Sequence, residues 1–518
     1  MTFDLNTPLA AQSPRATGMT THQPSEFQEA IYSAVRESSD NLLIEAVAGS
    51  GKTTTIIQAT EWTQDPTIFL AFAKANADDV RGKILKGEAK TLNSLGHRCW
   101  MTQCYGARID FDKKEKLIQR LLPDEARRRI GFTVSRIISA AKNNGLGLDG
   151  PGEVRDADFE RFISAGDYDI DAEQVAEVAH FSRLVFIASR QDLSTFDFDD
   201  QLYMPVYQQW PMPWFGTILL DEAQDLNTIQ HLFVERLGSA GSRLIGVGDR
   251  HQAIYMFRGA LADSMDQLRD RFRMHELPLS ISYRCPQRVI EEAQTLVPHI
   301  QARPGAMRGE VMHQDQLWKE KEKLSSDYND DPQIMDSDAR DPETWPDGWL
   351  ILCRNNAPLF SAVMRMVRAR KPCRVLSNAL EGLAGFLKKF RTDDIYIMRA
   401  KLSRWKEKEI LAAQAKGMDW KIAAIEDKAN TIEVLSKGFE TVFEIVSLLK
   451  TLSEGRSGPM FATIHKAKGL EADHVYLLRP DLVPGWWIRD PAQLQQEYNL
   501  KYVAITRARQ TFTYGVRG

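Results

Sequence analysis

The sequence is short of the features that mark secreted, membrane and zinc-bound proteins. Its five cysteines are scattered, with no CxxC pair and no zinc-type spacing, which argues for free thiols in a reducing compartment. No apolar run approaches the ~20 residues needed to cross a bilayer. Residues 1–23 lack the apolar core of a signal peptide. We therefore expect a cytoplasmic protein without membrane association, and a disordered tail over 1–23.

A strong net charge is also absent. The 518 residues carry a formal net charge of −4, and their 43% hydrophobic and 26% charged content is ordinary for a globular protein. This balance argues against a uniformly basic nucleic-acid coat. It allows a basic groove, because local charge and not net charge steers a polyanion. The length predicts about two to four domains.

The stretch EAVAGSGKTTT, residues 45–55, carries the first functional signal. The apolar run 41–44 before it predicts a buried strand, and the residues from Thr53 onward have helical spacing. A strand, a glycine-rich turn ending in Gly-Lys-Thr and a helix together predict a phosphate-binding loop. Ala46 stands where the usual pattern has its first glycine.

Each residue type in this loop has a physical reason. Gly49 and Gly51 let the backbone N–H groups turn toward an anion, and the start of the next helix adds its positive dipole end. Lys52 is expected to reach the β- and γ-phosphates, while the Thr53 hydroxyl would hold Mg²⁺. We expect the nucleotide site to be lined by Ala48, Gly49, Ser50, Gly51, Lys52, Thr53 and Thr54.

Alternation of strands and helices predicts an α/β fold with parallel sheets. Strand signal is strong at 67–72, 217–220 and 243–247, and fades over 98–195, where helices are predicted at 111–122, 128–143 and 172–190. A second α/β region follows, with candidate strands at 279–283, 310–313, 349–353, 374–377, 460–464, 474–478, 502–505 and 511–516. The order sheet, helical insertion, sheet therefore occurs twice.

These signals predict four parts. The first α/β domain (1A) is expected over 24–97 and 196–276, with a helical insertion (1B) at 98–195. The second (2A) is expected over 277–377 and 456–518, with a short helical insertion (2B) at 378–455.

The segment TILLDEAQD, residues 217–225, is an apolar strand ending in carboxylates. Asp221 can hold Mg²⁺ opposite Thr53, and Glu222 can orient and deprotonate the water that attacks the γ-phosphate. An Asp-Glu pair after a strand also occurs at ordinary helix starts. The phosphate loop in the same chain favours the catalytic interpretation.

The segment GDRHQAIYMFRGA, residues 248–260, follows the next strand. Gln252 is placed to sense the γ-phosphate. Tyr255 and Phe257 are two positions apart, so both rings could face one side of an extended segment and stack on bases. The alternative is that both are core aromatics.

Six segments in order carry a family resemblance: AVAGSGKTTT, LLDEAQD, GDRHQAIYMFRGA, SYR, TIHKAKGLEADHVYLL and YVAITRAR. Together they resemble the UvrD/Rep/PcrA-like branch of superfamily 1 DNA helicases. The segments EAVAGSGKT and QEYNLKYVAITRAR are most similar in sequence to the F-box DNA helicase group, although no F-box segment is visible. The resemblance spans 28–509 and implies two RecA-like P-loop domains, each with an α-helical insertion.

The resemblance implies roles around ATP. Gln28 would read the adenine edge and Tyr283 would stack on the base. Arg284 and Arg507 would reach the γ-phosphate from the second domain, where guanidinium forks suit phosphate oxygens. Glu471 is expected near the ribose hydroxyls and the domain interface. Catalysis is thus split between two domains.

The resemblance also implies a track for single-stranded DNA. In the first domain its residues would be Phe72, Lys74, Asn76, Asn93, Tyr255 and Phe257. In the second they would be Arg354, Asn356, Thr463 and His465. The family usually has His where Asn93 stands. Arg354 could instead form a surface ion pair.

These observations predict an ATP- and Mg²⁺-dependent DNA helicase or translocase that moves on single-stranded DNA, 3′ to 5′ by resemblance, in repair or recombination. It would bind single strands and junctions as a monomer, near the nucleoid if the source is bacterial or phage. The alternatives are a translocase that strips proteins such as recombinases from DNA, and a helicase-like subunit of a nuclease or defence complex.

Overall fold

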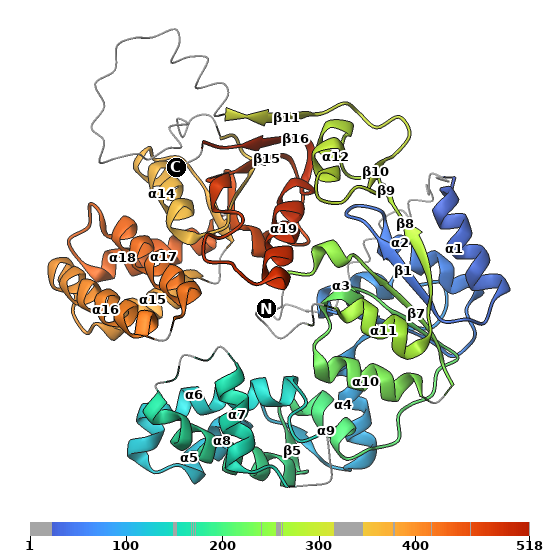
Figure 1. Ribbon diagram of the computed structural model, residues 1–518, viewed down its shortest axis with the longest axis horizontal. Coiled ribbons are helices and arrows are strands. Elements are labelled where there is room, and N and C mark those ends of the chain that lie inside the picture. The colour runs from blue at the N-terminus through green and yellow to red at the C-terminus, as the bar shows by residue number, and fades with distance from the viewer. Residues whose placement is uncertain are drawn as a thin grey trace, which may run out of the picture.

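The computed structural model describes residues 23–148, 153–166, 168, 170, 172–239, 241–254, 261, 263–314, 345–376, 379–415, 417–455 and 457–516. The tail predicted over 1–23 lies outside these residues except for Gln23, and so do Tyr255 and Phe257. The described chain forms two halves, each a parallel sheet with a group of helices beside it (Figure 1).

The first sheet has the strand order β3-β2-β6-β7-β1-β8, and all its pairs are parallel. Its strands are β1 (Leu42–Ala46), β2 (Thr67–Ala71), β3 (Glu88–Thr91), β6 (Thr217–Leu220), β7 (Arg243–Gly248) and β8 (His275–Leu279). The four central strands are almost entirely buried, which explains their continuous apolar runs.

The first sheet extends beyond the boundary predicted at 276. Strand β8 pairs with β1 from Leu42–His275 to Ala46–Leu279. The strand predicted at 279–283 therefore has the wrong bounds. Leu279 is the last residue of β8, and Ile281–Ser282 form a separate strand, β9. Strand β8 lies at the sheet edge with most of its residues exposed, so its polar start gave no apolar signal.

Helices pack around this sheet and continue into the first insertion. Those beside the sheet are α1 (Glu26–Glu37), α2 (Lys52–Ala59), α3 (Lys74–Arg81), α4 (Leu92–Gln103), α9 (Asp200–Tyr207), α10 (Thr228–Gly238) and α11 (Ser264–Phe272). The insertion contains α5 (Lys113–Leu121), α6 (Asp124–Asn143), α7 (Asp156–Ala165) and α8 (Val175–Gln191). A short strand pair, β4 (Arg108–Ile109) with β5 (Thr195–Phe196), closes its base.

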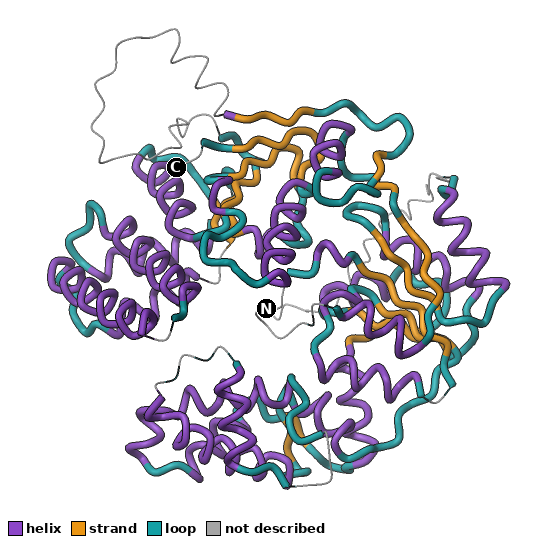
Figure 2. Tube along the Cα trace, viewed as in Figure 1, coloured by secondary structure: helices purple, strands orange, loops and turns teal. Residues whose placement is uncertain are grey.

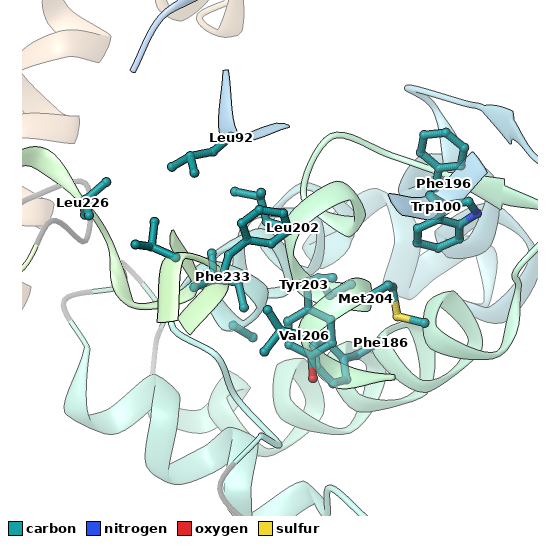
Figure 3. Packing of buried hydrophobic residues seen from close by; sticks show 14 of the residues in the cluster. Leu92, Trp100, Phe186, Phe196, Leu202, Tyr203, Met204, Val206, Leu226 and Phe233 are labelled. Atoms are coloured by element: carbon teal, nitrogen blue, oxygen red, sulfur yellow. The ribbon is translucent and has the colours of Figure 1, made fainter. Parts of the chain in front are cut away.

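The first insertion shares one hydrophobic core with the sheet. Figure 3 shows Leu202 and Tyr203 of α9 in the same buried cluster as Phe186 of the insertion and Phe233 of α10. The Trp100 ring stacks on Phe196 with centroids 4.8 Å apart. Because apolar contact is continuous, the insertion is attached as one body to the first half.

The second sheet has the order β11-β16-β15-β12-β14-β13, again all parallel. Its strands are β11 (Glu310–His313), β12 (Leu350–Cys353), β13 (Arg374–Leu376), β14 (Met460–Thr463), β15 (Ala472–Leu477) and β16 (Ala508–Tyr514). Helices α12 (Gln287–Gln294), α14 (Asn356–Arg368) and α19 (Pro491–Ile505) cover it, and β9 pairs with β10 (Gln301–Ala302) near the junction of the halves.

The strand predicted at 502–505 is wrong. Tyr502–Ile505 are the last turn of α19, which starts at Pro491 after the N-cap Asp490. All four residues are fully buried, so the run has no polar face and its period cannot separate a buried helix from a buried strand.

The described residues of the second insertion form four helices, drawn in purple like the other helices in Figure 2. They are α15 (Ala379–Lys389), α16 (Ile395–Ala415), α17 (Asp419–Ser436) and α18 (Val442–Glu454). Their apolar residues join Ile351 and Phe461 of the second sheet in one core. Within the described ranges, no helix combines the length and apolar character that a membrane crossing requires.

Candidate active site

The loop between β1 and α2 has the backbone of an anion cradle. Gly49 and Gly51 have positive φ angles of 73° and 77°, which side chains with a Cβ rarely adopt. Gly51 is the N-cap of α2, so the first N–H groups of that helix face the loop. The predicted strand and helix on either side of the loop are confirmed.

Two acidic residues face this loop from the end of β6. The Thr53 hydroxyl donates to Asp221 Oδ2 at 3.2 Å, and Lys52 Nζ lies 3.4 Å from Glu222 Oε2. They meet because the carboxyl ends of parallel strands lie at one edge of a sheet. Converging hydroxyl and carboxylate oxygens are the donors that Mg²⁺ prefers, so Thr53 and Asp221 fit a divalent cation.

Glu222 has a strained backbone. Its φ of 53° and ψ of 42° place a non-glycine residue in the left-handed region. Its carboxylate accepts a hydrogen bond from the Gln224 side chain, whose Oε1 accepts from the Asp249 N–H at 3.0 Å. This arrangement directs the Glu222 carboxylate toward Lys52.

Burial and charge set the ionisation of this group. Burial alone would lower the pKa of Lys52, but Glu222, Asp249 and Asp221 raise it. Burial alone would raise the pKa of Glu222, but Lys52 and Lys468 hold it at about 2. Burial and the adjacent Glu222 charge raise the pKa of Asp221 to about 6. Lys52 and Glu222 are therefore both charged at neutral pH.

The opposite wall comes from the second half. A cavity of about 540 Å³ lies between the phosphate loop and the second half, and this volume suits a nucleotide. It is lined by Gly49, Ser50, Gly51, Lys52, Thr53, Thr54, Phe72, Ala73, Asn76, Glu222, Asp225, Gln252, Arg284, Lys468, Gly469 and Arg507. Five of the residues predicted to act at the phosphates therefore line one cavity, whereas Asp221 is buried behind it and contacts Thr53.

Arg507 is fully buried and held from several sides. Its Nε donates to Val503 O at 2.9 Å, and its Nη2 lies 3.4 Å from Gln252 Oε1 in the first half. Burial, assisted by the nearby Arg284 charge, lowers the pKa of Arg507 to about 10, so it stays cationic. Gln252 also donates to Asp249 Oδ2 at 2.6 Å.

Arg284 and Glu471 form an ion pair. Arg284 Nε donates to Glu471 Oε2 at 2.7 Å, and Arg509 Nη1 lies 3.3 Å from the other carboxylate oxygen. Glu471 therefore contacts Arg284, one of the arginines expected to reach the γ-phosphate, and its place near the ribose hydroxyls stays a prediction.

The two residues expected to bind adenine are in contact. The Tyr283 hydroxyl donates to Gln28 Oε1 at 3.4 Å, and Gln28 Nε2 donates to Thr55 Oγ1 at 3.0 Å. Gln28 also closes a capping box with Ser25 at the start of α1. The side chain is thus held beside the phosphate loop.

Sequence reasoning missed two residues that join the halves. Lys468 donates to Asp225 and, at 2.8 Å, to the carbonyl of Gln252. The hydroxyl of Tyr502 accepts from the Ala48 N–H at 2.9 Å. Both residues lie inside segments that carry the family resemblance, which indicates that they matter. The sequence does not show which residues they contact.

The DNA contacts predicted in the first half have mixed surroundings. Phe72, 41% exposed, and Asn76 line the cavity wall, and Lys74 is exposed at the start of α3. Asn93 donates its amide to Phe198 O at 3.0 Å.

Those in the second half follow the carboxyl ends of β12 and β14. Arg354 makes a bidentate pair with Glu497 at 2.7 and 2.8 Å, and Asn356 donates to Asp427 of the second insertion. Thr463 ends β14 opposite Cys353, and His465 is half-buried in the turn that follows.

Comparison with known proteins matches both halves. The UvrD/REP helicase N-terminal domain matches 27–273, and the UvrD-like helicase C-terminal domain matches 377–514. F-box DNA helicase protein 1 of Schizosaccharomyces pombe is 24% identical over 541 residues, covering 96% of this chain and 57% of that protein.

Bacterial relatives match over shorter stretches. DNA helicase II of Haemophilus influenzae is 23% identical over 379 residues, covering 65% of this chain and 49% of that protein. ATP-dependent DNA helicase PcrA of Leuconostoc citreum is 24% identical over 304 residues, covering 51% and 38%. The chain therefore spans just over half of the yeast relative and less than half of these two.

Proposed function

Because this chain belongs to the UvrD-like helicase family, we propose that it is an ATP-dependent DNA helicase that moves 3′ to 5′ on single-stranded DNA. The observation that carries the proposal is the cavity shared by the two halves. Lys52 and Glu222 line it from the first half, and Arg284 and Arg507 from the second.

Each side chain has a task at the phosphates. The Lys52 ammonium neutralises charge on the β- and γ-phosphates, and the loop N–H groups bind their oxygens. The ionised Glu222 accepts a proton from the attacking water. A divalent cation at Thr53 and Asp221 would supply further positive charge to the phosphate oxygens.

The arginines complete the site only when the halves meet. Arg284 and Arg507 place guanidinium groups where negative charge develops as the γ-phosphoryl group leaves. Gln252 contacts Arg507 of the second half and Asp249 of the first half. A γ-phosphate bound next to Gln252 can therefore affect side chains of both halves. Turnover therefore requires the halves to approach, and product release allows them to separate.

The contact between the halves is extensive enough to transmit this motion. Val47 and Ala48, at the start of the phosphate loop, pack in the same apolar cluster as Tyr502 and Val503 of α19. A change in the loop on hydrolysis thus acts directly on a helix of the second half. Single-stranded DNA held by both halves would be advanced by each cycle.

Steady-state ATPase measurements with and without single-stranded DNA test the proposal. We expect hydrolysis to rise several-fold when an oligothymidylate is added, and Arg284→Ala to lose about 10³-fold in kcat. A matched control is Arg288→Ala, whose exposed side chain pairs with the neighbouring Glu291. ATPase insensitive to DNA, or unaffected by Arg284→Ala, would contradict the proposal.

A further inference from the structure

The loop 483–490, between β15 and α19, carries an exposed tryptophan. Trp486 is 56% exposed, and Trp487 lies half-buried beside it with ring centroids 5.9 Å apart at 88°. Neither residue belongs to the DNA contacts expected from the sequence. Indole rings are large flat surfaces, and a nucleobase stacks on such a surface.

A partly buried ion pair supports this loop. Glu497, in the second turn of α19, binds the guanidinium of Arg354 with both oxygens and accepts from the Gly485 N–H at 3.1 Å. The Arg354 guanidinium lies over the Trp487 ring, 4.7 Å from its centroid. The Arg354 side chain therefore connects the sheet edge, α19 and the tryptophan loop.

The loop is also closely packed. A Cβ at Gly485 would lie 2.7 Å from the Trp487 ring, so only glycine lets that ring fold back over the backbone. The guanidinium of Arg489 donates to Trp486 O at 2.7 Å. A rigid support of this kind lowers the entropy cost of presenting an exposed ring to a ligand.

The loop lies beside the predicted DNA track. Arg354 directly follows β12, whose last residue Cys353 is opposite Thr463, an expected DNA contact. Gln496 donates to Ile254 O, just before the segment predicted to stack on bases. Helix α19, which the loop leads into, lies between the second sheet and the first half (Figure 1).

The surroundings of Trp486 favour a nucleobase over a protein surface. Its exposed neighbours in the loop are Pro484, Arg489 and Asp490, so the exposed indole is bordered by one small apolar ring and two charged side chains. Protein-binding patches usually extend over several hundred Å². A lone aromatic ring beside an arginine matches the pattern of base stacking with phosphate contact.

We propose that Trp486 is a stacking platform for an unpaired base of single-stranded DNA, positioned by the Arg354–Glu497 pair. This inference rests on the proposed function. It changes the role of Arg354, which is a positioning residue that acts through Trp487 and not a direct phosphate contact.

Binding to two oligonucleotides tests the platform. Fluorescence anisotropy compares an oligothymidylate with an abasic strand of the same length, which keeps the phosphates and lacks the bases. Trp486→Ala should bind oligothymidylate about 5- to 150-fold more weakly and the abasic strand unchanged. Trp486→Phe should keep most of the affinity. Trp420→Ala, which truncates a 37% exposed tryptophan of α17, is the matched control.

Arg354→Lys separates the two roles of Arg354. Lysine keeps the charge but loses the planar fork and the stacking. A positioning role predicts weaker binding to oligothymidylate alone, and the double variant with Trp486→Ala no weaker than Trp486→Ala itself. A direct phosphate contact predicts small, equal effects on both strands, and that result would overturn the assignment.

The outcomes distinguish the platform from the proposed function. Wild-type protein that binds neither strand contradicts both. Equal affinity of the wild type and Trp486→Ala for oligothymidylate would contradict only the platform. An equal loss of affinity for both strands in Trp486→Ala would do the same. A far-UV circular dichroism spectrum and a Tm like those of the wild type show that each variant is folded.

Discussion

The Lys468 ammonium of the second half lies 2.8 Å from Asp225 Oδ1 and 2.8 Å from the carbonyl oxygen of Gln252 in the first half. The Asp225 side chain is only 2% exposed. Burial raises the pKa of Asp225 to about 6 in spite of the opposing effect of Lys468. One ammonium thus compensates a buried carboxylate next to the ATP cavity and fastens the halves together.

Lys468→Met should destabilise the protein by about 3–5 kcal/mol, because it leaves Asp225 buried without a cation. Thermal unfolding gives the change in Tm. The double variant Lys468→Met/Asp225→Asn should recover much of the loss, since the buried charge is gone. A Tm equal to the wild type for Lys468→Met would show that the pair does not hold the halves together.

Gly49→Ala and Gly51→Ala should differ in their effect on turnover. Both place a Cβ on a residue with positive φ, but only at Gly49 would that Cβ lie 2.6 Å from Arg284 Cβ and 2.9 Å from Ser282 Oγ. Gly49→Ala should therefore push Arg284 away and reduce kcat about 10²-fold. Gly51→Ala has no atom within 4 Å of its Cβ and serves as the control for backbone strain. Equal kcat values in the two variants would contradict the close approach at Gly49.

Lys52→Ala and Glu222→Gln should abolish most ATP turnover, with a loss of about 10²–10⁴-fold for Glu222→Gln as the general base is removed. Glu222→Gln should still bind nucleotide, because the loop and Lys52 remain. Fluorescent nucleotide binding and phosphate release measure the two steps separately. Lys83→Ala, on the exposed face of the same half, is the control. An active Lys52→Ala would remove the basis of the site assignment.

The buried His231 should make stability depend on pH. Burial lowers the pKa of His231 to about 4, against the opposing effect of Asp263, while the unfolded chain keeps about 6.5. Between these values the unfolded chain takes up a proton and the folded one does not. Stability should therefore fall as pH drops below 6.5, by about 2 kcal/mol at about pH 5.

His231→Gln should reduce that pH dependence. His231 Nε2 lies 2.8 Å from Ser264 Oγ, which itself donates to Ala223 O beside Glu222, so the ring nitrogen is the donor. A glutamine amide can donate in its place and does not titrate. Tm measured at about pH 7 and about pH 5 should differ less in His231→Gln than in the wild type. The same difference in both would assign the acid sensitivity elsewhere.

Lys113→Met should destabilise the first half by about 1–3 kcal/mol, because it leaves buried carbonyl groups without a donor. The Lys113 ammonium is 2% exposed and donates to the carbonyls of Ser189, Asp192 and Thr195. It also lies 2.8 Å from the fully buried Asp200, whose other carboxylate oxygen pairs with Lys142 at 2.6 Å. Lys116→Met is the matched control, since its exposed pair with Asp110 should change Tm little. Similar Tm losses in both would contradict the role of burial.

Much of the ATP site could be predicted from the sequence because its residues stand in short segments beside strands. Thr53 and Asp221 face each other as expected, since parallel strands bring their carboxyl ends to one edge. Gln28 and Tyr283, each expected at the adenine, lie within hydrogen-bond distance of each other. The apolar run 502–505 was misread because burial on every side removes the period that distinguishes helix from strand.

Long-range pairing could not be predicted. Arg354 and Glu497 are 143 residues apart, and Lys468 and Asp225 are 243 apart. A single sequence shows that these residues are charged, but the partner is set by how the two sheets face each other. The start of the edge strand β8 could not be predicted for a related reason. Its residues form a strand because they pair with β1, and the sequence does not show that pairing.

The central claim is that hydrolysis between the two halves drives strand separation. The most direct measurement is displacement of a labelled strand from duplexes with a 3′ or a 5′ single-stranded tail, with ATP and Mg²⁺, using wild type and Glu222→Gln. We expect displacement from the 3′-tailed duplex by the wild type only. No displacement from either duplex, with DNA-stimulated ATPase intact, would contradict it.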